Sequence, residues 1–75
     1  MIELSERTIV VTGAAGGLGS GVCRHLRDAG ARVVALDVSG EALRNAFADD
    51  AGIEMRTVDL LDPAGLAIVR DEILA

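Results

Sequence analysis

Five of the nine glycines stand between Gly13 and Gly21, directly after a run of β-branched residues. That run, Thr8–Thr12, predicts a buried strand, and the apolar spacing after the glycines predicts a helix over residues 18–29. Glycines at such a turn let the backbone approach a phosphate, and the first N–H groups of the helix stabilise its charge. The segment therefore predicts a parallel α/β unit with an anion-binding loop.

The alternation of strand and helix patterns continues along the chain. Further strands are predicted at Arg32–Asp37 and 54–59, and further helices at 40–49 and from Pro63 onward. Ser39 and Asp62 are the expected N-caps, and Gly30 supplies a left-handed end to the first helix. The expected fold is α/β, a βαβαβα Rossmann-like segment with a three-stranded parallel sheet in the order 3-2-1. The alternating third strand suits an edge.

Each predicted helix has an apolar stripe, and right-handed crossovers place the first two helices on one face of the sheet. The stripes are Leu18, Val22, Leu26 and Ala29; Ala42, Leu43, Ala46 and Phe47; and Leu66, Val69 and Ile73. No fourth strand follows the third helix, so the first strand is left with an open edge. The sequence predicts an incomplete doubly wound fold that needs a partner or further sequence.

Composition excludes several functions. The chain has no Lys, Tyr or Trp, and its net charge is −5, which argues against nucleic acid as a partner. No apolar run is long enough to span a membrane, and no segment resembles a secretory signal. A single cysteine, Cys23, suits a reducing cytoplasmic location and a packing role. His25 is expected to be a solvated helix residue, Asp49 and Asp50 a solvated turn, and no metal site is predicted.

The glycine loop reads Thr12-Gly13-Ala14-Ala15-Gly16-Gly17-Leu18-Gly19, or TGxxxGxG, and resembles the cofactor loop of the short-chain dehydrogenase/reductase family. The loop also satisfies the TGxxGxxG pattern of the extended relatives, but those usually carry a bulky apolar residue in place of Gly17. The shorter-chain subgroup is therefore favoured. The resemblance implies a set of cofactor-binding residues: Gly13, Gly16, Gly17, Leu18, Gly19, Asp37, Asp59 and Leu60. In the family, the Thr12 hydroxyl would tie the loop to a fourth strand.

Asp37 closes the second strand, 18 residues beyond Gly19. A carboxylate there can accept hydrogen bonds from both ribose hydroxyls of adenosine and repel a 2′-phosphate, so NAD is predicted over NADP. Arg44 is the one cation that could favour NADP. By the resemblance, Asp59 contacts the adenine amino group and Leu60 borders the ring. The alternative is that Asp59 or Asp62 only caps the third helix; Asp62, beside Pro63, suits that role better.

The family's catalytic Tyr-x-x-x-Lys pair, with its Ser and Asn, has no counterpart here, so no catalytic residue is predicted. The resemblance implies that residues 1–75 are the N-terminal half of a dinucleotide-binding domain, with no second domain. Its parent would transfer hydride between a nicotinamide cofactor and an alcohol or carbonyl substrate. The expected partners are the dinucleotide and a missing C-terminal half or second chain, and the parent would form a homo-oligomer.

Two other functions stay open. One is a stand-alone nucleotide-binding or oligomerising module without catalysis. The other is an S-adenosylmethionine-dependent methyltransferase fragment, since Gly17-x-Gly19-x-Gly21 imitates the glycine loop of that class. That class typically has an acid near the end of its first strand, where Thr12 stands, so this reading is the weaker one.

Overall fold

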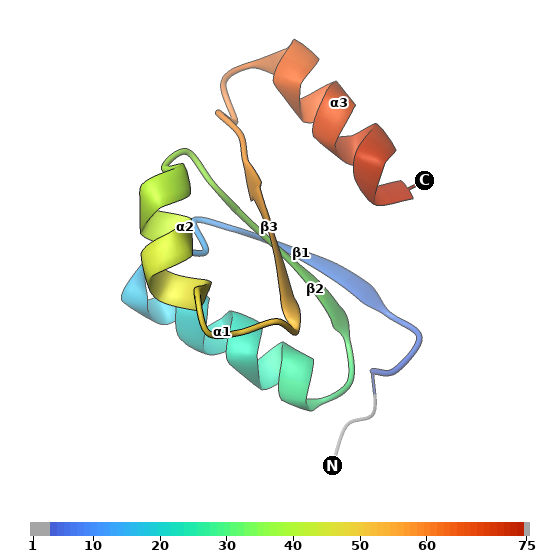
Figure 1. The fold of residues 1–75 in the computed structure, drawn as a ribbon. Helices are drawn as coiled ribbons and strands as arrows, with labels where there is room; N and C mark the ends of the chain where they lie inside the picture. Colours follow the sequence, from blue (N-terminus) through green and yellow to red (C-terminus); the bar gives the residue numbers. More distant parts are fainter. Residues whose placement is uncertain (1–3, 75) are drawn as a thin grey trace.

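The computed structural model describes residues 4–74, in which three strands alternate with three helices (Figure 1). The elements are β1 (Thr8–Thr12), α1 (Gly17–Asp28), β2 (Arg32–Asp37), α2 (Gly40–Phe47), β3 (Ile53–Thr57) and α3 (Pro63–Leu74). The first two strands have their predicted bounds. The third begins one residue early and ends two residues early. Beyond it, an Asp59 carboxylate oxygen accepts a hydrogen bond from the Leu61 amide and turns the chain.

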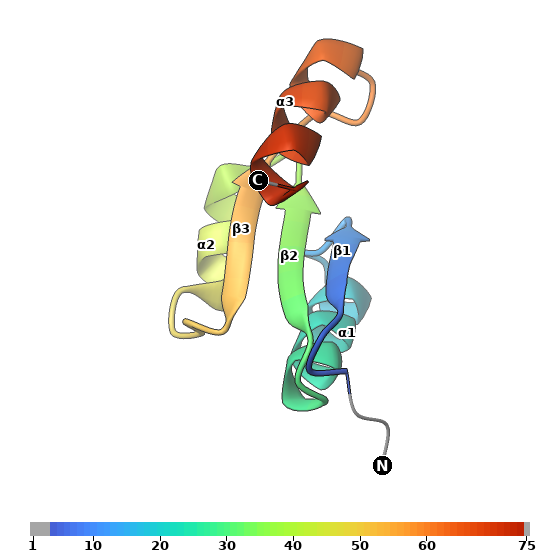
Figure 2. The ribbon, with the colours of Figure 1, turned by 90° about the vertical axis from the view of Figure 1, so that its right-hand side faces the viewer.

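The strands form one parallel sheet in the order β1-β2-β3, which is compatible with the expected 3-2-1 order read from the other edge. Figure 2 shows the three arrows pointing the same way. The Cα atoms pair in register, with Val10 opposite Val34 and Val34 opposite Glu54. The central strand β2 is buried from Val33 to Leu36, whereas β1 is an edge in this sheet and its Val10 is 44% exposed. The open edge of β1 was expected. The prediction that Thr8–Thr12 is buried is wrong, because within the described residues this strand pairs only with β2 and none of its five residues is buried.

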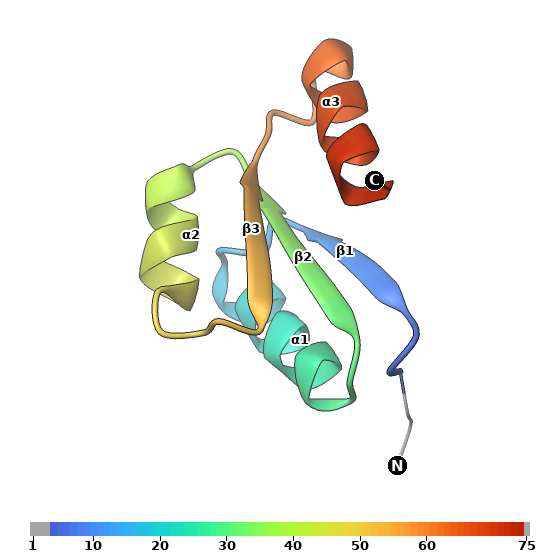
Figure 3. The same cartoon turned by 45° about the vertical axis from the view of Figure 1, so that its right-hand side comes forward.

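Helices α1 and α2 lie on one side of the sheet and α3 on the other (Figures 1 and 3). Each side has its own apolar cluster. Leu43 and Phe47 of α2 are buried on the first side, and Val69 of α3 is buried on the second with Leu66 and Ile73 beside it. The predicted stripes of these two helices are therefore confirmed. None of the helices in residues 4–74 is long and apolar enough to cross a membrane.

The stripe predicted for α1 is wrong at its N-terminal end. Leu18 is 86% exposed and Val22 is 40% exposed, and the buried residue of this helix is Cys23. Cys23 packs in the same cluster as Val33 of the central strand, with Leu26 one turn further on. The helix is thus rotated so that a small residue faces the sheet, which confirms the packing role expected for Cys23.

The helix ends follow the expected signals. Gly30 has a φ of +99°, the left-handed conformation that ends α1, and its amide donates to the Arg27 carbonyl. The Ser39 side chain accepts a hydrogen bond from the Ala42 amide and caps α2. The Asp62 carbonyl accepts from Leu66 at the start of α3.

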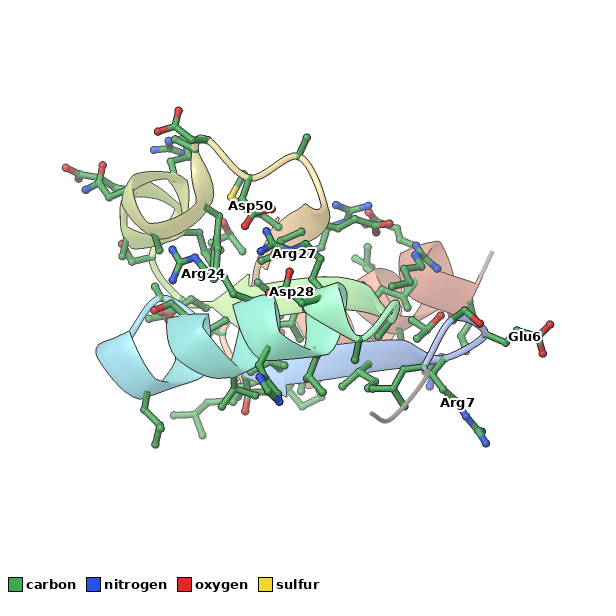
Figure 4. The ribbon with its side chains drawn as sticks, turned by 90° about the horizontal axis from the view of Figure 1, so that it is seen from below. Glu6, Arg7, Arg24, Arg27, Asp28 and Asp50 are labelled. Carbon is green, nitrogen blue, oxygen red and sulfur yellow. The ribbon has the colours of Figure 1, made fainter. Side chains whose placement is uncertain are left out.

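Two arginines of α1 bind the end of α2 and the turn that follows it (Figure 4). Arg24 lies over the Phe47 ring, 5.4 Å from its centroid, and donates to the Ala46 carbonyl. Arg27 forms an ion pair with Asp50, and the side chains point toward each other. The prediction that Asp50 is merely solvated is therefore wrong, because its partner is 23 residues away and no local pattern marks it.

Stability is expected to fall in acid through this ion pair. The hydrogen bond from Arg27 lowers the pKa of the Asp50 carboxyl below its usual value. A depressed folded-state pKa gives stability that is present above the unfolded-state pKa and is lost as pH falls through the folded-state pKa. Thermal unfolding of Asp50→Asn should show a smaller fall in Tm between neutral and acidic pH than thermal unfolding of wild type. Asp49→Asn, which removes the same charge one residue earlier, should behave as wild type; equal losses in all three proteins would contradict this expectation.

Candidate functional site

A hollow of about 280 Å³ opens at the carboxyl ends of all three strands. It is lined by residues at or just beyond those ends: Thr12, Gly13, Leu36, Asp37, Val38, Val58, Asp59 and Leu60. Parallel strands joined by right-handed crossovers bring their carboxyl ends to one edge of the sheet, where open α/β folds bind ligands. The hollow thus combines an apolar lining with two carboxylates.

The glycine loop joins this hollow to α1. Gly13 has a φ of +63°, which side-chain-bearing residues rarely adopt, so glycine is required for the turn out of β1. A Cβ on Gly19 would lie 2.5 Å from the Gly13 carbonyl oxygen, so the helix packs against the loop with no room for a methyl group. A Cβ on Gly17, by contrast, would meet nothing within 4 Å. There is therefore no free space beside Gly19, whereas the space beside Gly17 is free.

The N-terminus of α1 suits an anion. Its N-cap residue is Gly16, no side chain caps it, and no acid lies in the first turn. The first N–H groups of a helix have no acceptor within the helix, and the helix dipole is positive at this end. A phosphate group would satisfy these donors without competition from a capping side chain.

Asp37 connects two loops. One carboxylate oxygen accepts from the Ala15 amide at 3.1 Å and the other from the Ser39 amide at 3.3 Å. These bonds, that from Ala15 first, lower the pKa of the Asp37 carboxyl below its usual value. Asp37 is half-buried and charged, and it borders the hollow.

The second carboxylate of the hollow belongs to Asp59, which is exposed. This carboxylate accepts a hydrogen bond from the Leu61 amide. Leu60, half-exposed, and Val38, 68% exposed, present apolar surface to the same space. Two apolar side chains beside a carboxylate can hold a flat ring and pair with a donor on its rim.

The structure brings together four of the predicted binding residues: Gly13, Asp37, Asp59 and Leu60. Gly16, Gly17, Leu18 and Gly19 lie at the beginning of α1 and do not line the hollow. Leu18 and Gly17 instead border a separate shallow hollow along α1. Leu36, Val38 and Val58 also line the hollow and were not predicted to do so. Their position at strand ends was a signal that could have found them.

The family model for short chain dehydrogenase matches residues 7–73. The chain belongs to the short-chain dehydrogenase family. It is 39% identical over 74 residues to 1-deoxy-11-beta-hydroxypentalenate dehydrogenase of Streptomyces avermitilis, covering 93% of this chain and 27% of that enzyme. It is 35% identical to fluoren-9-ol dehydrogenase of a Terrabacter species, covering 96% of this chain and 21% of that enzyme. The chain thus spans about a quarter of the length of these curated relatives.

Solved short-chain dehydrogenase structures share the fold. An NADPH-bound short-chain oxidoreductase from Pseudomonas aeruginosa superposes with a TM-score of 0.86 at 29% identity, covering 96% of this chain and 30% of that one. A metagenomic short-chain oxidoreductase in complex with NADP gives a TM-score of 0.83 at 33% identity, covering 95% and 34%. The expected Rossmann-like α/β segment is confirmed. The methyltransferase and stand-alone-module readings gain no support from these comparisons.

Proposed function

We propose that this chain is the N-terminal half of the dinucleotide-binding domain of a short-chain dehydrogenase, and that it binds the adenosine and pyrophosphate parts of a nicotinamide cofactor. The parent enzyme would oxidise an alcohol or reduce a carbonyl compound. One observation carries the proposal. The glycine loop connects the hollow, with its two carboxylates, to the N-terminus of α1, which no side chain caps. Residues 1–75 would thus contribute no second domain.

The residues present fit such a cofactor, which would carry the hydride. The first N–H groups of α1 would bind the pyrophosphate, and the open space at Gly17 would admit its approach. Asp37 would accept hydrogen bonds from the ribose hydroxyls. Asp59 would accept from the adenine amino group, while Leu60 and Val38 would border the ring.

We propose NAD as the preferred cofactor. The charged residues that line the hollow, Asp37 and Asp59, are both acids and would repel the extra phosphate of NADP. The bound NADPH and NADP of the two solved relatives support the opposite preference. Arg44 is the cation that could favour NADP. Its Nη1 lies at the start of α2, 3.2 Å from the position that a Cβ on Gly40 would take.

Catalysis would come from sequence outside this chain. The chain contains no Tyr and no Lys, and therefore lacks the acid/base pair expected from the family. A C-terminal half or a second chain would supply these groups. The role left to the described residues is to bind and orient the cofactor.

Calorimetric titration of the full-length protein with NAD, NADP and S-adenosylmethionine tests the proposal. NAD should bind more tightly than NADP, and S-adenosylmethionine should not compete with NAD for binding. Asp37→Ala should weaken NAD binding about tenfold or more, the scale of lost charge-assisted hydrogen bonds, and reduce the preference over NADP.

Arg44→Ala is the complementary variant. It should leave NAD affinity unchanged, whereas a marked loss of NADP affinity would show that Arg44 reads the 2′-phosphate. Tighter binding of NADP by wild type would overturn the NAD assignment. Binding of neither dinucleotide would overturn the proposed function.

A further inference from the structure

The Asp37 carboxylate binds the glycine loop directly. Its contact with the Ala15 amide spans 22 residues of sequence and links the end of β2 to the middle of the loop. Beside it, the Ala14 amide donates to the Leu36 carbonyl at 3.0 Å, so two successive loop amides are bound to two successive residues of β2. The other oxygen of Asp37 accepts from Ser39 and fixes the turn into α2.

The glycines of the loop contribute weaker contacts. The Gly16 amide donates to the Gly13 carbonyl at 3.3 Å, and three of the loop residues between Gly13 and Gly17 are glycines, which have the largest backbone freedom to lose. Gly13, Gly16 and Gly17 have no side chains that could pack. Ala14 and Ala15 pack against the core, and the Ala14 amide binds the β2 backbone. The Asp37 carboxylate, 3.1 Å from the Ala15 amide, adds a charged acceptor to these long-range restraints on the loop.

We propose that Asp37 is a positioning residue as well as a ribose acceptor: it sets the conformation of the glycine loop before a dinucleotide arrives. The part concerning the ribose rests on the proposed function, but the positioning of the loop does not. The same carboxylate would bind the cofactor and order the loop. The loss of Asp37 should therefore weaken the binding even of a ligand that has no ribose hydroxyls. A preordered loop has less conformational entropy to lose on binding.

Hydrogen exchange of the cofactor-free full-length protein tests the positioning directly. In Asp37→Ala, the Ala15 amide should exchange about tenfold faster or more than in wild type, with unchanged protection of Val34 in the central strand. Asp37→Asn, which keeps a neutral acceptor, should give an intermediate rate. The matched control is Asp59→Ala, which removes an equal charge from the same hollow but no contact with the glycine loop. In this variant the Ala15 rate should equal that of wild type.

Several results would overturn the inference. One is an Ala15 rate in Asp37→Ala and Asp37→Asn that stays within twofold of wild type; another is an equal acceleration in Asp59→Ala. If Asp37→Ala loses protection at Val34 as well, the comparison rests on Asp37→Asn, whose Ala15 rate must rise while Val34 stays protected. None of these readings uses a cofactor, so a failure here is distinct from a failure to bind NAD.

A second measurement separates positioning from direct contact. The probe is an NAD analogue that contains 2′,3′-dideoxyadenosine. It lacks the two ribose hydroxyls from which Asp37 would accept hydrogen bonds. Asp37→Ala should still bind this analogue at least about threefold more weakly than wild type, because the loop is less ordered. Equal affinities would show that Asp37 acts on the ribose alone and would overturn the positioning role.

Discussion

Gly19→Ala is expected to destabilise the protein by about 1–3 kcal/mol or more, the range of overpacking, and to abolish dinucleotide binding. The added methyl carbon would lie 2.5 Å from the Gly13 carbonyl oxygen and 3.0 Å from the Ala14 Cα atom. Both obstacles are backbone atoms, so no side-chain rotation can relieve the contact. The loop must move away from α1, and the hollow that Gly13 lines changes with it. Denaturant unfolding and calorimetric titration with NAD would measure the two effects.

The same helix contains two matched controls. A Cβ on Gly21 or on Gly17 would meet nothing within 4 Å. Gly21→Ala should therefore be neutral or stabilise the helix by up to about 1 kcal/mol. Gly17→Ala should keep the fold but weaken cofactor binding, because the open space there is the expected approach of the pyrophosphate. Equal stability of Gly19→Ala and Gly21→Ala would contradict the close packing of loop and helix.

Phe47→Ala is expected to have the second large effect, a loss of about 3–5 kcal/mol of unfolding free energy. Phe47 is 1% exposed, and it is the largest side chain among the fully buried ones. It packs with Leu43, Ile53 and Cys23 between α1, α2 and the sheet, and Arg24 covers its ring. Its removal leaves a cavity among these packed side chains. Denaturant unfolding measures the change.

Leu61→Ala is the control for that substitution. Leu61 is 89% exposed in the described residues, so the loss of its side chain should change the unfolding free energy by less than about 0.5 kcal/mol. Similar losses for Phe47→Ala and Leu61→Ala would contradict the placement of the core under α2.

Local sequence signals were sufficient for much of the fold. The β-branched run at Thr8–Thr12 and the apolar run at Arg32–Asp37 defined two strands to the residue. Ser39 and Gly30 marked helix ends because their roles depend on local backbone geometry. The burial of α1 was predicted less well. Periodicity finds an apolar stripe but not which part of it meets the sheet, and Cys23 rather than Leu18 does so.

The site divides in the same way. Residues at strand ends, such as Asp37 and Asp59, were predictable because parallel strands bring their carboxyl ends together. The contacts between Asp37 and Ala15 and between Arg27 and Asp50 were not, since each joins residues more than 20 positions apart in the sequence. Such pairs depend on how the helices and loops pack in three dimensions, which no local pattern encodes.

The pairing of each strand with the next one along the chain has a consequence for biosynthesis. β1 and β2 can pair once Asp37 has left the ribosome, and β3 adds to a surface that already exists. The hollow is complete when Leu60 has emerged, because every lining residue lies at or before that position. A nascent chain can therefore pair these strands in the order of their synthesis. A nucleotide that binds there would stabilise the growing polypeptide by mass action, before later residues are made.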